Sequence, residues 1–246
     1  MTTTISRRKT LQMFGLAGAA SLFGSGQAMA TTVLPKKWDM TCDVLVVGGG
    51  AAGMFAAVSA KEAKAGEVIL LEKNPALYLN STSYSDGYFS TCSSKFQKKA
   101  GVKDPGAKTF ADEVFSIGKQ IGDPEVIKTY AEHSGEAVDW LDEHGIDWTF
   151  IKNPAYGIKR TLSNGTGSGA IYIKVLEQEA NKMGVKIFLD TRATALITSP
   201  EGSEVLGVSC EDDEGQKFIR VKKGVVLATG GFFGDVNLID LSLIHI

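Results

Sequence analysis

The sequence predicts an α/β fold in which a parallel sheet is interrupted by an antiparallel meander. Three observations lead to this prediction. A buried apolar strand, a glycine-rich turn, an alanine-rich helix and a second strand follow one another in residues 42–73. Short strands separated by turn sequences such as SPEGSE and DDEGQK occupy residues 186–221. A last apolar run, GVVLATGG at residues 224–231, predicts a fully buried strand.

The first 30 residues predict a leader that does not belong to this fold. Arg7 and Arg8 precede a glycine- and alanine-rich apolar run, and Ala28-Met29-Ala30 has the small-x-small pattern of a peptidase site. The run is shorter than the roughly 20 residues that span a bilayer. SRRKTL resembles the twin-arginine motif, which addresses folded proteins for export. We therefore expect a signal peptide over residues 1–30, export by the twin-arginine machinery to the periplasm or cell exterior, and no stable membrane span. A membrane anchor or a surface helix is the alternative.

The composition is that of a globular protein, with 43% hydrophobic and 22% charged residues. The net charge of −2 becomes −5 without the three cations of the predicted leader, which argues against a nucleic-acid partner. Cys42, Cys92 and Cys210 are widely spaced and predict neither a metal site nor a disulfide framework. The sequence contains no C-x-x-C-H motif, so no c-type haem attachment is expected.

The remaining elements follow from local patterns. Residues 31–40 predict a linker, and residues 41–240 predict one domain in which residues 80–105 form an ordered loop region. A helix begins at Pro124 after the N-cap Asp123 and ends near Gly145. A second helix is expected over residues 169–183, and the short strands are expected at Lys186–Leu189, Ala193–Thr198, Val205–Cys210 and Phe218–Val221.

The strongest functional motif is Gly48-x-Gly50-x-x-Gly53, between the first strand and its helix. The first glycine permits a tight turn, the second lets the backbone approach a pyrophosphate, and the third lets the helix pack on the strand. Glu72 ends the second strand, where a carboxylate accepts the hydroxyls of an adenosine ribose. A structural glycine turn is the alternative, but the combination predicts a dinucleotide site. GGGAAG followed by LLEK favours FAD over NAD.

Five segments together resemble the flavoprotein subunits of the fumarate reductase/succinate dehydrogenase family: DVLVVGGGAAGMFAA, LLEK, NSTSYSDGYFS, TRATALI and GVVLATGGF. The resemblance is to the soluble, exported branch that includes flavocytochrome c fumarate reductases, urocanate reductases and 3-oxosteroid dehydrogenases, and it covers about residues 40–235 in family order. It implies a Rossmann-like FAD-binding domain of the glutathione-reductase type. No His occupies the loop after Glu72, where covalently flavinylated members carry their attachment, so FAD is expected to bind non-covalently.

The resemblance also implies roles for individual residues: the glycine turn for the pyrophosphate, Glu72 for the ribose, and Ala193 for the adenine edge. Leu79 and Asp86 depart from the family, which usually has small residues there. Asn80 and Ser81 could instead form a plain turn, and Ala193 could be an ordinary strand residue. The predicted FAD-binding residues are Gly48, Gly50, Ala51, Ala52, Gly53, Glu72, Lys73, Asn80, Ser81, Gly87, Ala193, Thr229 and Gly230.

The function that the resemblance implies is an exported FAD-dependent oxidoreductase. It would reduce the activated C=C bond of a small acid such as fumarate or urocanate by hydride transfer from flavin N5. Electrons would come from an external cytochrome or quinol-linked donor. Two alternatives are dehydrogenation of a 3-oxosteroid by the same fold, and a flavin-binding electron-transfer module without a substrate of its own.

In this family the groups that perform the chemistry all follow the ATGGF segment, where the chain forms a capping domain and then returns to complete the flavin domain. We therefore expect no catalytic residue in residues 41–240, and we expect the chain as written to be an inactive, unstable N-terminal fragment. The tail LSLIHI, residues 241–246, matches the translation of a transposon end used in sequencing libraries. We expect this tail to be non-native; a genuine apolar C-terminus is the alternative.

Four other residues resemble catalytic groups, but we expect none of them to be one. His133 and His144 belong to a helix surface, and Cys92 is expected to be a quiet small residue and not a reactive thiol. Arg160 is expected to be solvated, with anion binding as the alternative. The segment GTGSGA, residues 165–170, lacks the Lys-Ser/Thr of a phosphate loop and predicts a closely packed helix start.

Overall fold

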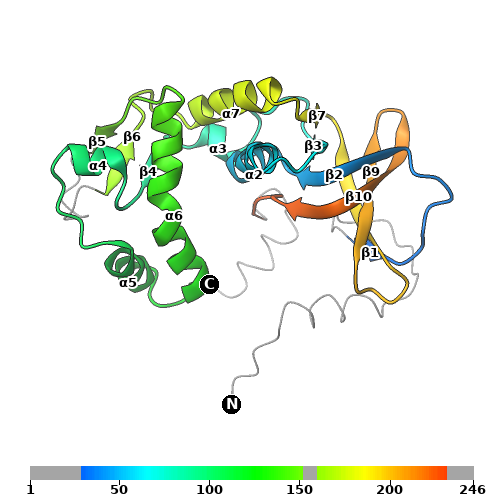
Figure 1. The fold of residues 1–246 in the computed structure, drawn as a ribbon, viewed down its shortest axis with the longest axis horizontal. Helices are drawn as coiled ribbons and strands as arrows, with labels where there is room; N and C mark the ends of the chain where they lie inside the picture. The colour runs from blue at the N-terminus through cyan, green and yellow to red at the C-terminus, as the bar shows by residue number, and fades with distance from the viewer. Residues whose placement is uncertain (1–28, 152–159, 232–246) are drawn as a thin grey trace, which may run out of the picture. The chain divides into compact units, whose positions relative to one another are not determined.

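The computed structural model describes residues 29–151 and 160–231, so most of the predicted leader and the predicted tail at 241–246 lie outside the described residues. The described chain divides into two compact units. The first contains residues 29–80 and 176–231, and the second contains residues 81–151 and 160–175. Figure 1 traces both units along the chain.

A seven-stranded sheet forms the first unit (Figure 1), in the order β1-β8-β9-β10-β2-β3-β7. Strands β10, β2, β3 and β7 pair in parallel, whereas β8, β9 and β10 form an antiparallel meander. This topology confirms the predicted α/β fold with an inserted meander. The strands are β1 (Met29–Thr31), β2 (Met40–Val47), β3 (Val68–Leu71), β7 (Lys186–Phe188), β8 (Arg192–Thr198), β9 (Val205–Asp212) and β10 (Gly215–Leu227).

Helix α2 (Ala51–Glu62) connects β2 to β3 and completes the predicted strand–helix–strand unit. At the end of β2, Val47 pairs with Leu71 of β3 on one side and with Leu227 of β10 on the other. Because parallel strands end at the same edge of a sheet, the three carboxyl ends lie together. We call this the carboxyl edge; the glycine turn lies on it.

Strand β10 is continuous, so the prediction of two separate strands in this region is wrong. Its register against β2 shifts between Val221 and Gly224. Lys222 and Lys223 occupy this bulge and interrupt the apolar pattern that the sequence prediction followed. β10 pairs with β2 on both sides of this bulge, and Ile219 and Arg220 also pair with β9, so β10 joins the meander to the parallel part of the sheet.

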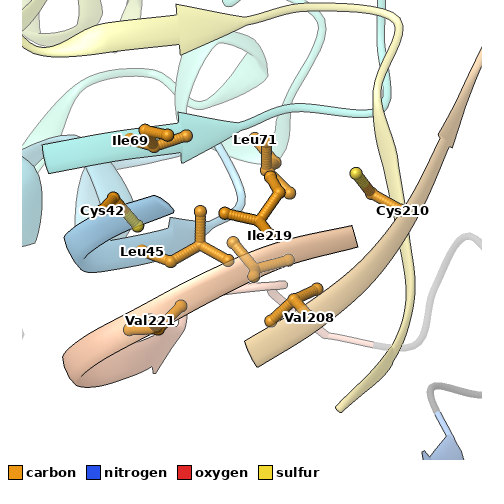
Figure 2. Packing of buried hydrophobic residues seen from close by; sticks show 9 residues of the cluster. Cys42, Leu45, Ile69, Leu71, Val208, Cys210, Ile219 and Val221 are labelled. Atoms are coloured by element: carbon orange, nitrogen blue, oxygen red, sulfur yellow. The ribbon is translucent and has the colours of Figure 1, made fainter. Parts of the chain in front are cut away.

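The core of the first unit lies against one face of this sheet, where small and branched side chains of four strands meet (Figure 2). Burial raises the pKa of the Cys42 thiol to about 12 and that of Cys210 to about 11, so both stay protonated near neutral pH. The residues labelled in Figure 2 are Cys42, Leu45, Ile69, Leu71, Val208, Cys210, Ile219 and Val221.

The last apolar run is less buried than the sequence predicts. Val226 is 38% exposed and Leu227 is 56% exposed, although both belong to β10. The expectation of a fully buried strand over residues 224–231 is therefore wrong for the described part of the chain. Apolar composition indicates that a strand can be buried, but it does not show that other described residues pack over it.

The second unit combines helices with a small antiparallel sheet, β4-β6-β5. The region 80–105, predicted as a loop, contains two short helices and a strand. The helix after Asp123 is confirmed, with the Asp123 carboxylate accepting the N–H of Glu125 at 2.9 Å. The elements are α3 (Ser81–Tyr84), β4 (Tyr88–Ser90), α4 (Lys95–Lys99), α5 (Ala107–Ile117), α6 (Pro124–Glu143), β5 (Thr149–Phe150), β6 (Thr161–Ser163) and α7 (Ala170–Lys182), which continues into the first unit.

Arg160 is buried, so the expectation of a solvated residue is wrong. Its Nη1 donates to both carboxylate oxygens of Asp104 at 2.9 Å, and its Nε donates to Glu113 Oε2 at 2.9 Å. The guanidinium carbon also lies 4.7 Å from the centre of the Phe110 ring. Two carboxylates already neutralise this cation, so the cluster ties the loop around residue 104 to α5.

The other residues that were expected not to be catalytic lie in surroundings that agree with this expectation. Cys92 is 2% exposed, and burial raises its pKa, so the thiol is inert. His133 lies on the exposed face of α6, 3.0 Å from Glu136 Oε2. The ring of His144 stacks on Trp140 with 3.7 Å between ring centres.

No helix in residues 29–151 and 160–231 combines the length and the apolar character needed to cross a bilayer. In the same part of the chain, no three His, Cys, Asp or Glu side chains are grouped as metal ligands. Met29 and Ala30, the last two residues of the predicted leader, form β1 with Thr31, parallel to β8. The boundary of the leader stays a prediction.

Candidate dinucleotide site

The glycine turn directly follows β2 at the carboxyl edge. Gly48 has φ +109°, a conformation that favours glycine. A Cβ on Gly48 would lie 2.3 Å from the carbonyl oxygen of Ala228, and one on Gly53 would lie 1.8 Å from the carbonyl oxygen of Gly48. Backbone atoms cannot yield by that much, so neither position has room for a side chain. The first and third glycines of the motif have the steric roles that the sequence predicts.

Helix α2 starts in the middle of this turn. Gly50 is its N-cap, and no side chain caps the helix or places an acid in its first turn. The first turn contains the small residues Ala51 and Ala52. Backbone N–H groups and the positive end of the helix dipole together favour an anion at such a start. A diphosphate has the charge and the acceptor oxygens that this position requires.

The Glu72 carboxylate is directed at the glycine turn from the end of β3. Its Oε2 accepts the N–H of Gly49 at 2.7 Å, and its Oε1 accepts the N–H of Asn74 at 2.9 Å. Glu72 is 6% exposed. Each carboxylate oxygen has a further lone pair, so the group can also accept ribose hydroxyls. The sequence placed Glu72 correctly at the turn but missed Gly49 and Asn74, which hold it.

Asn80 reaches back to the same turn from the end of the loop after Glu72. Its Nδ2 lies 3.4 Å from the carbonyl oxygen of Gly49 and also donates to the carbonyl of Leu77. Leu77 is buried, and its Cδ2 would lie 2.6 Å from a Cβ on Gly49. The structure therefore brings Asn80 beside the glycine turn, as predicted, and adds Leu77 as a packing neighbour.

Ala193 is connected to this edge through the segment that precedes it. The N–H of Thr191 donates to the carbonyl of Glu72 at 2.9 Å, and the N–H of Glu72 donates to the carbonyl of Phe188 at 2.8 Å. Ala193 follows two residues later, near the start of β8, and is partly buried. Lys73 is exposed next to Glu72. The adenine edge and the ribose acid of the prediction thus lie on adjoining backbone segments.

Thr229 and Gly230 follow the end of β10 beside the turn. The N–H of Ala228 donates to the carbonyl of Val47 at 2.8 Å, which fixes the end of β10 against the end of β2. The Cα of Thr229 lies 3.3 Å from the place that a Cβ on Gly48 would take. Both Thr229 and Gly230 are at least partly exposed, so neither is fully covered by the described residues.

Ser81 and Gly87 belong to the second unit. Ser81 is exposed and opens α3. Gly87 is buried with φ +71°, and a Cβ there would lie 2.4 Å from Asn164 Nδ2 and 2.7 Å from the carbonyl oxygen of Ser168. Its carbonyl accepts the hydroxyl of Tyr172 at 2.5 Å. Packing within the second unit explains the glycine at 87, and the FAD contacts of both residues stay predictions.

The residues at the carboxyl edge fit a dinucleotide on three structural observations. The turn has no room for a Cβ at two positions, the helix start has no side-chain cap, and a buried carboxylate lies next to both. The glycine turn and the helix start can bind a diphosphate. The carboxylate can accept ribose hydroxyls and would repel a 2′-phosphate.

Comparisons with known proteins agree with this chemistry. Residues 43–240 match the family described as FAD binding domain, which confirms the prediction that the dinucleotide is FAD. The acrylate reductase flavoprotein subunit of Shewanella woodyi is 28% identical over 244 residues, 95% of this chain and 48% of the relative. The urocanate reductase of Eggerthella lenta is 29% identical over 208 residues, 83% of this chain and 34% of the relative.

Among solved structures, the open conformation of a flavocytochrome c3 fumarate reductase is similar to this chain with a TM-score of 0.76 and 30% identity. The match covers 83% of this chain and 36% of that structure. The chain therefore spans about half or less of the length of the relatives that it matches.

Proposed function

Because the chain belongs to the FAD-binding domain family, we propose that it is the FAD-binding part of an exported reductase that acts on a small unsaturated acid. The reaction is the reduction of an activated C=C bond, as in fumarate or urocanate. Relatives named as acrylate, urocanate and fumarate reductases support this substrate class. The observation that carries the proposal is the carboxyl edge, where the glycine turn, the uncapped start of α2 and Glu72 together provide a site for the AMP half of FAD.

When bound, FAD supplies hydride transfer to the double bond. The described residues hold and orient this cofactor. The N–H groups at the start of α2 neutralise the diphosphate charge, and the buried Glu72 fixes the ribose. The electrons come from an external donor, a cytochrome or a quinol-linked protein, and binding of FAD is non-covalent. The groups that protonate and clamp the substrate lie outside residues 41–240.

The proposal is tested on the protein expressed from its full gene. Purified protein should show flavin absorbance near 450 nm and release FAD on denaturation. Under anaerobic conditions it should oxidise reduced methyl viologen when fumarate, urocanate or acrylate is added. Turnover only with a 3-oxosteroid and an electron-accepting dye would replace the reductase by a dehydrogenase, and flavin without turnover on any substrate would favour an electron-transfer module.

A variant of the ribose acid tests the site, and a variant of an exposed acid is its matched control. Glu72→Ala removes a charged acceptor that contributes about 1.5–3 kcal/mol, so FAD affinity should fall about 10- to 150-fold. Viologen oxidation should fall with it and should be restored by excess FAD. Glu136→Ala, which changes an exposed acid of α6, should leave both unchanged. Full FAD retention by Glu72→Ala would remove this residue from the site.

Export by the twin-arginine route is tested with the leader itself. Replacing Arg7 and Arg8 by Lys should abolish export of a folded reporter fused after residue 40. Export that is unaffected would contradict this part of the proposal.

A further inference from the structure

Asn74 makes three hydrogen bonds to three different segments of the carboxyl edge, and no motif of the sequence pointed to it. It lies two residues after Glu72, at the start of a loop that ends at Asn80. Its backbone N–H, backbone carbonyl and side-chain amide each have a separate partner. These partners belong to the ribose acid, to the segment before β8, and to the end of the loop.

The first bond orients the ribose acid. The N–H of Asn74 donates to Glu72 Oε1 at 2.9 Å, while the N–H of Gly49 donates to Oε2 at 2.7 Å. One backbone donor on each oxygen fixes the plane of a carboxylate that is nearly fully buried. Each oxygen keeps a lone pair that a ribose hydroxyl can use.

The second bond holds the segment that leads to the predicted adenine edge. The carbonyl of Asn74 accepts the N–H of Asp190 at 3.1 Å. Asp190 has φ +48°, a left-handed conformation that is uncommon outside glycine although aspartate adopts it more readily than most residues, and the bond to Asn74 helps to hold it. The adjacent Thr191 N–H binds the carbonyl of Glu72 at 2.9 Å. Asn74 and Glu72 together therefore set the path of the chain into Ala193.

The third bond closes the loop beside the glycine turn. Asn74 Nδ2 donates to the carbonyl of Leu79 at 2.6 Å. Inside this closure, Leu77 is buried against Gly49, and the Asn80 amide reaches the Gly49 carbonyl at 3.4 Å. A second contact holds the same loop from outside, because the Tyr78 hydroxyl donates to Glu177 Oε2 of α7 at 2.8 Å.

We propose that Asn74 is a positioning residue for the AMP half of FAD, which acts by holding Glu72, the segment before Ala193 and the loop ending at Asn80 in one arrangement. The proposal rests on FAD binding at the carboxyl edge. Asn74 itself needs no contact with the cofactor. The side-chain amide contributes by closing the loop onto the Leu79 carbonyl, while the backbone groups of Asn74 hold Glu72 and Asp190.

Two substitutions separate the donor from the shape of the side chain. Asn74→Ala removes the side-chain bond, and Asn74→Asp keeps the shape but replaces the donor by a second carboxylate near Glu72. In the apoprotein prepared from the full gene product, both should weaken FAD binding about 5- to 10-fold, as expected for one lost hydrogen bond and a looser loop. ADP, which carries only the adenosine and diphosphate, should lose affinity by the same factor.

The pH dependence of FAD affinity provides a readout that a purely structural role of Asn74 would not change. Lowering the pH from 8 to about 4, the ordinary pKa of an aspartate side chain, protonates much of the introduced carboxyl of Asn74→Asp and restores a donor for the Leu79 carbonyl. FAD affinity of this variant, relative to the unsubstituted protein at each pH, should therefore recover toward acid pH, whereas that of Asn74→Ala should stay flat. If Asn74→Ala does not fold, this recovery carries the test alone.

The control is Tyr78→Phe, which removes the outer hydrogen bond of the same loop and should change FAD affinity less than twofold. An equal loss in Tyr78→Phe would show that general loop anchoring matters and would overturn a special role of Asn74. Loss of FAD affinity without loss of ADP affinity would overturn the assignment to the AMP half. A full gene product that binds no FAD at all would instead contradict the proposed function.

Discussion

Two glycine-rich segments of this chain precede helices, and they differ in what their glycines meet. Before α2, a Cβ on Gly48 or Gly53 would collide with backbone oxygens at 2.3 and 1.8 Å. Before α7, Gly165 and Gly167 have left-handed φ values, but a Cβ on either would meet no heavy atom within 4 Å beyond its chain neighbours. Gly169, directly before the helix, is the exception in this segment, because a Cβ there would lie 2.0 Å from the carbonyl oxygen of Thr82. The first pair is required by close backbone approach, and the second pair only by the turn.

The two helix starts also differ in how their N–H groups are used. At the start of α7, Ser168 Oγ accepts the N–H of Ala170 at 3.1 Å, and in the turn before it Asn164 Oδ1 accepts the N–H of Thr166 at 3.0 Å. At α2, no side chain caps the helix. A glycine-rich run therefore indicates an anion site when the helix behind it is left uncapped, and a packing turn when local side chains take the donors.

The largest effect is expected where the glycine cannot be replaced. Gly53→Ala places a Cβ 1.8 Å from the Gly48 carbonyl oxygen, so the turn must open and FAD should be lost from the purified protein. Gly167→Ala has open space and should cost only about 1–2 kcal/mol for its left-handed conformation. The ratio of 450 to 280 nm absorbance and the thermal unfolding of both variants test this. Stoichiometric FAD in Gly53→Ala would break the comparison.

A charge placed at each helix start should have opposite consequences. Ala52→Asp puts an acid into the first turn of α2, which should stabilise the apoprotein by about 0.3–1 kcal/mol but repel the diphosphate and weaken FAD binding about tenfold. Ala170→Asp at the start of α7 should leave FAD binding unchanged. FAD titration of the two apoproteins decides the matter. Equal effects of the two substitutions would show that the start of α2 is not the anion site.

The smallest effect concerns the buried thiols, two in the first unit and one in the second. Burial raises the pKa of Cys42 to about 12 and of Cys210 to about 11 from an ordinary value of 9.0, and it also raises that of Cys92. A thiol is neutral below its pKa, so this raised folded-state pKa costs no stability below pH 9, and the unfolded chain gains by ionising as the pH rises toward 12. Native protein should resist thiol reagents at pH 8 and lose unfolding free energy above pH 9. Rapid labelling at pH 8 would contradict this burial.

Sequence patterns predicted the parts of the fold that depend on neighbouring residues. The strand, turn and helix around Gly48 and Gly53 follow from local periodicity and backbone sterics, and the Asp123 cap follows from its own next two residues. Lys222 and Lys223 misled the prediction of β10, because a bulge accepts polar residues without ending a strand.

Other features depend on residues that are far apart in the sequence, and these were missed. Arg160 is buried because Asp104 and Glu113 come from distant segments to pair with it. The small sheet of the second unit pairs β4 with β6, although more than two helices lie between them in the sequence. Strands of two or three residues are too short to show a periodic pattern, so this pairing could not be predicted. Asn74 belongs to no motif, because its partners are the Glu72 carboxylate and two backbone groups whose positions only the fold sets.

The pairing of β2 with the end of β10 has a consequence for when the cofactor site comes into existence. Gly48 and Ala228 are 180 residues apart in the sequence, yet a Cβ on Gly48 would lie 2.3 Å from the Ala228 carbonyl oxygen. Contacts between such distant segments form slowly, because a long chain must close before they are made. During synthesis, the carboxyl edge stays incomplete until residue 228 has left the ribosome. FAD can therefore be held by the complete carboxyl edge only after this strand has paired, in the compartment where that pairing occurs.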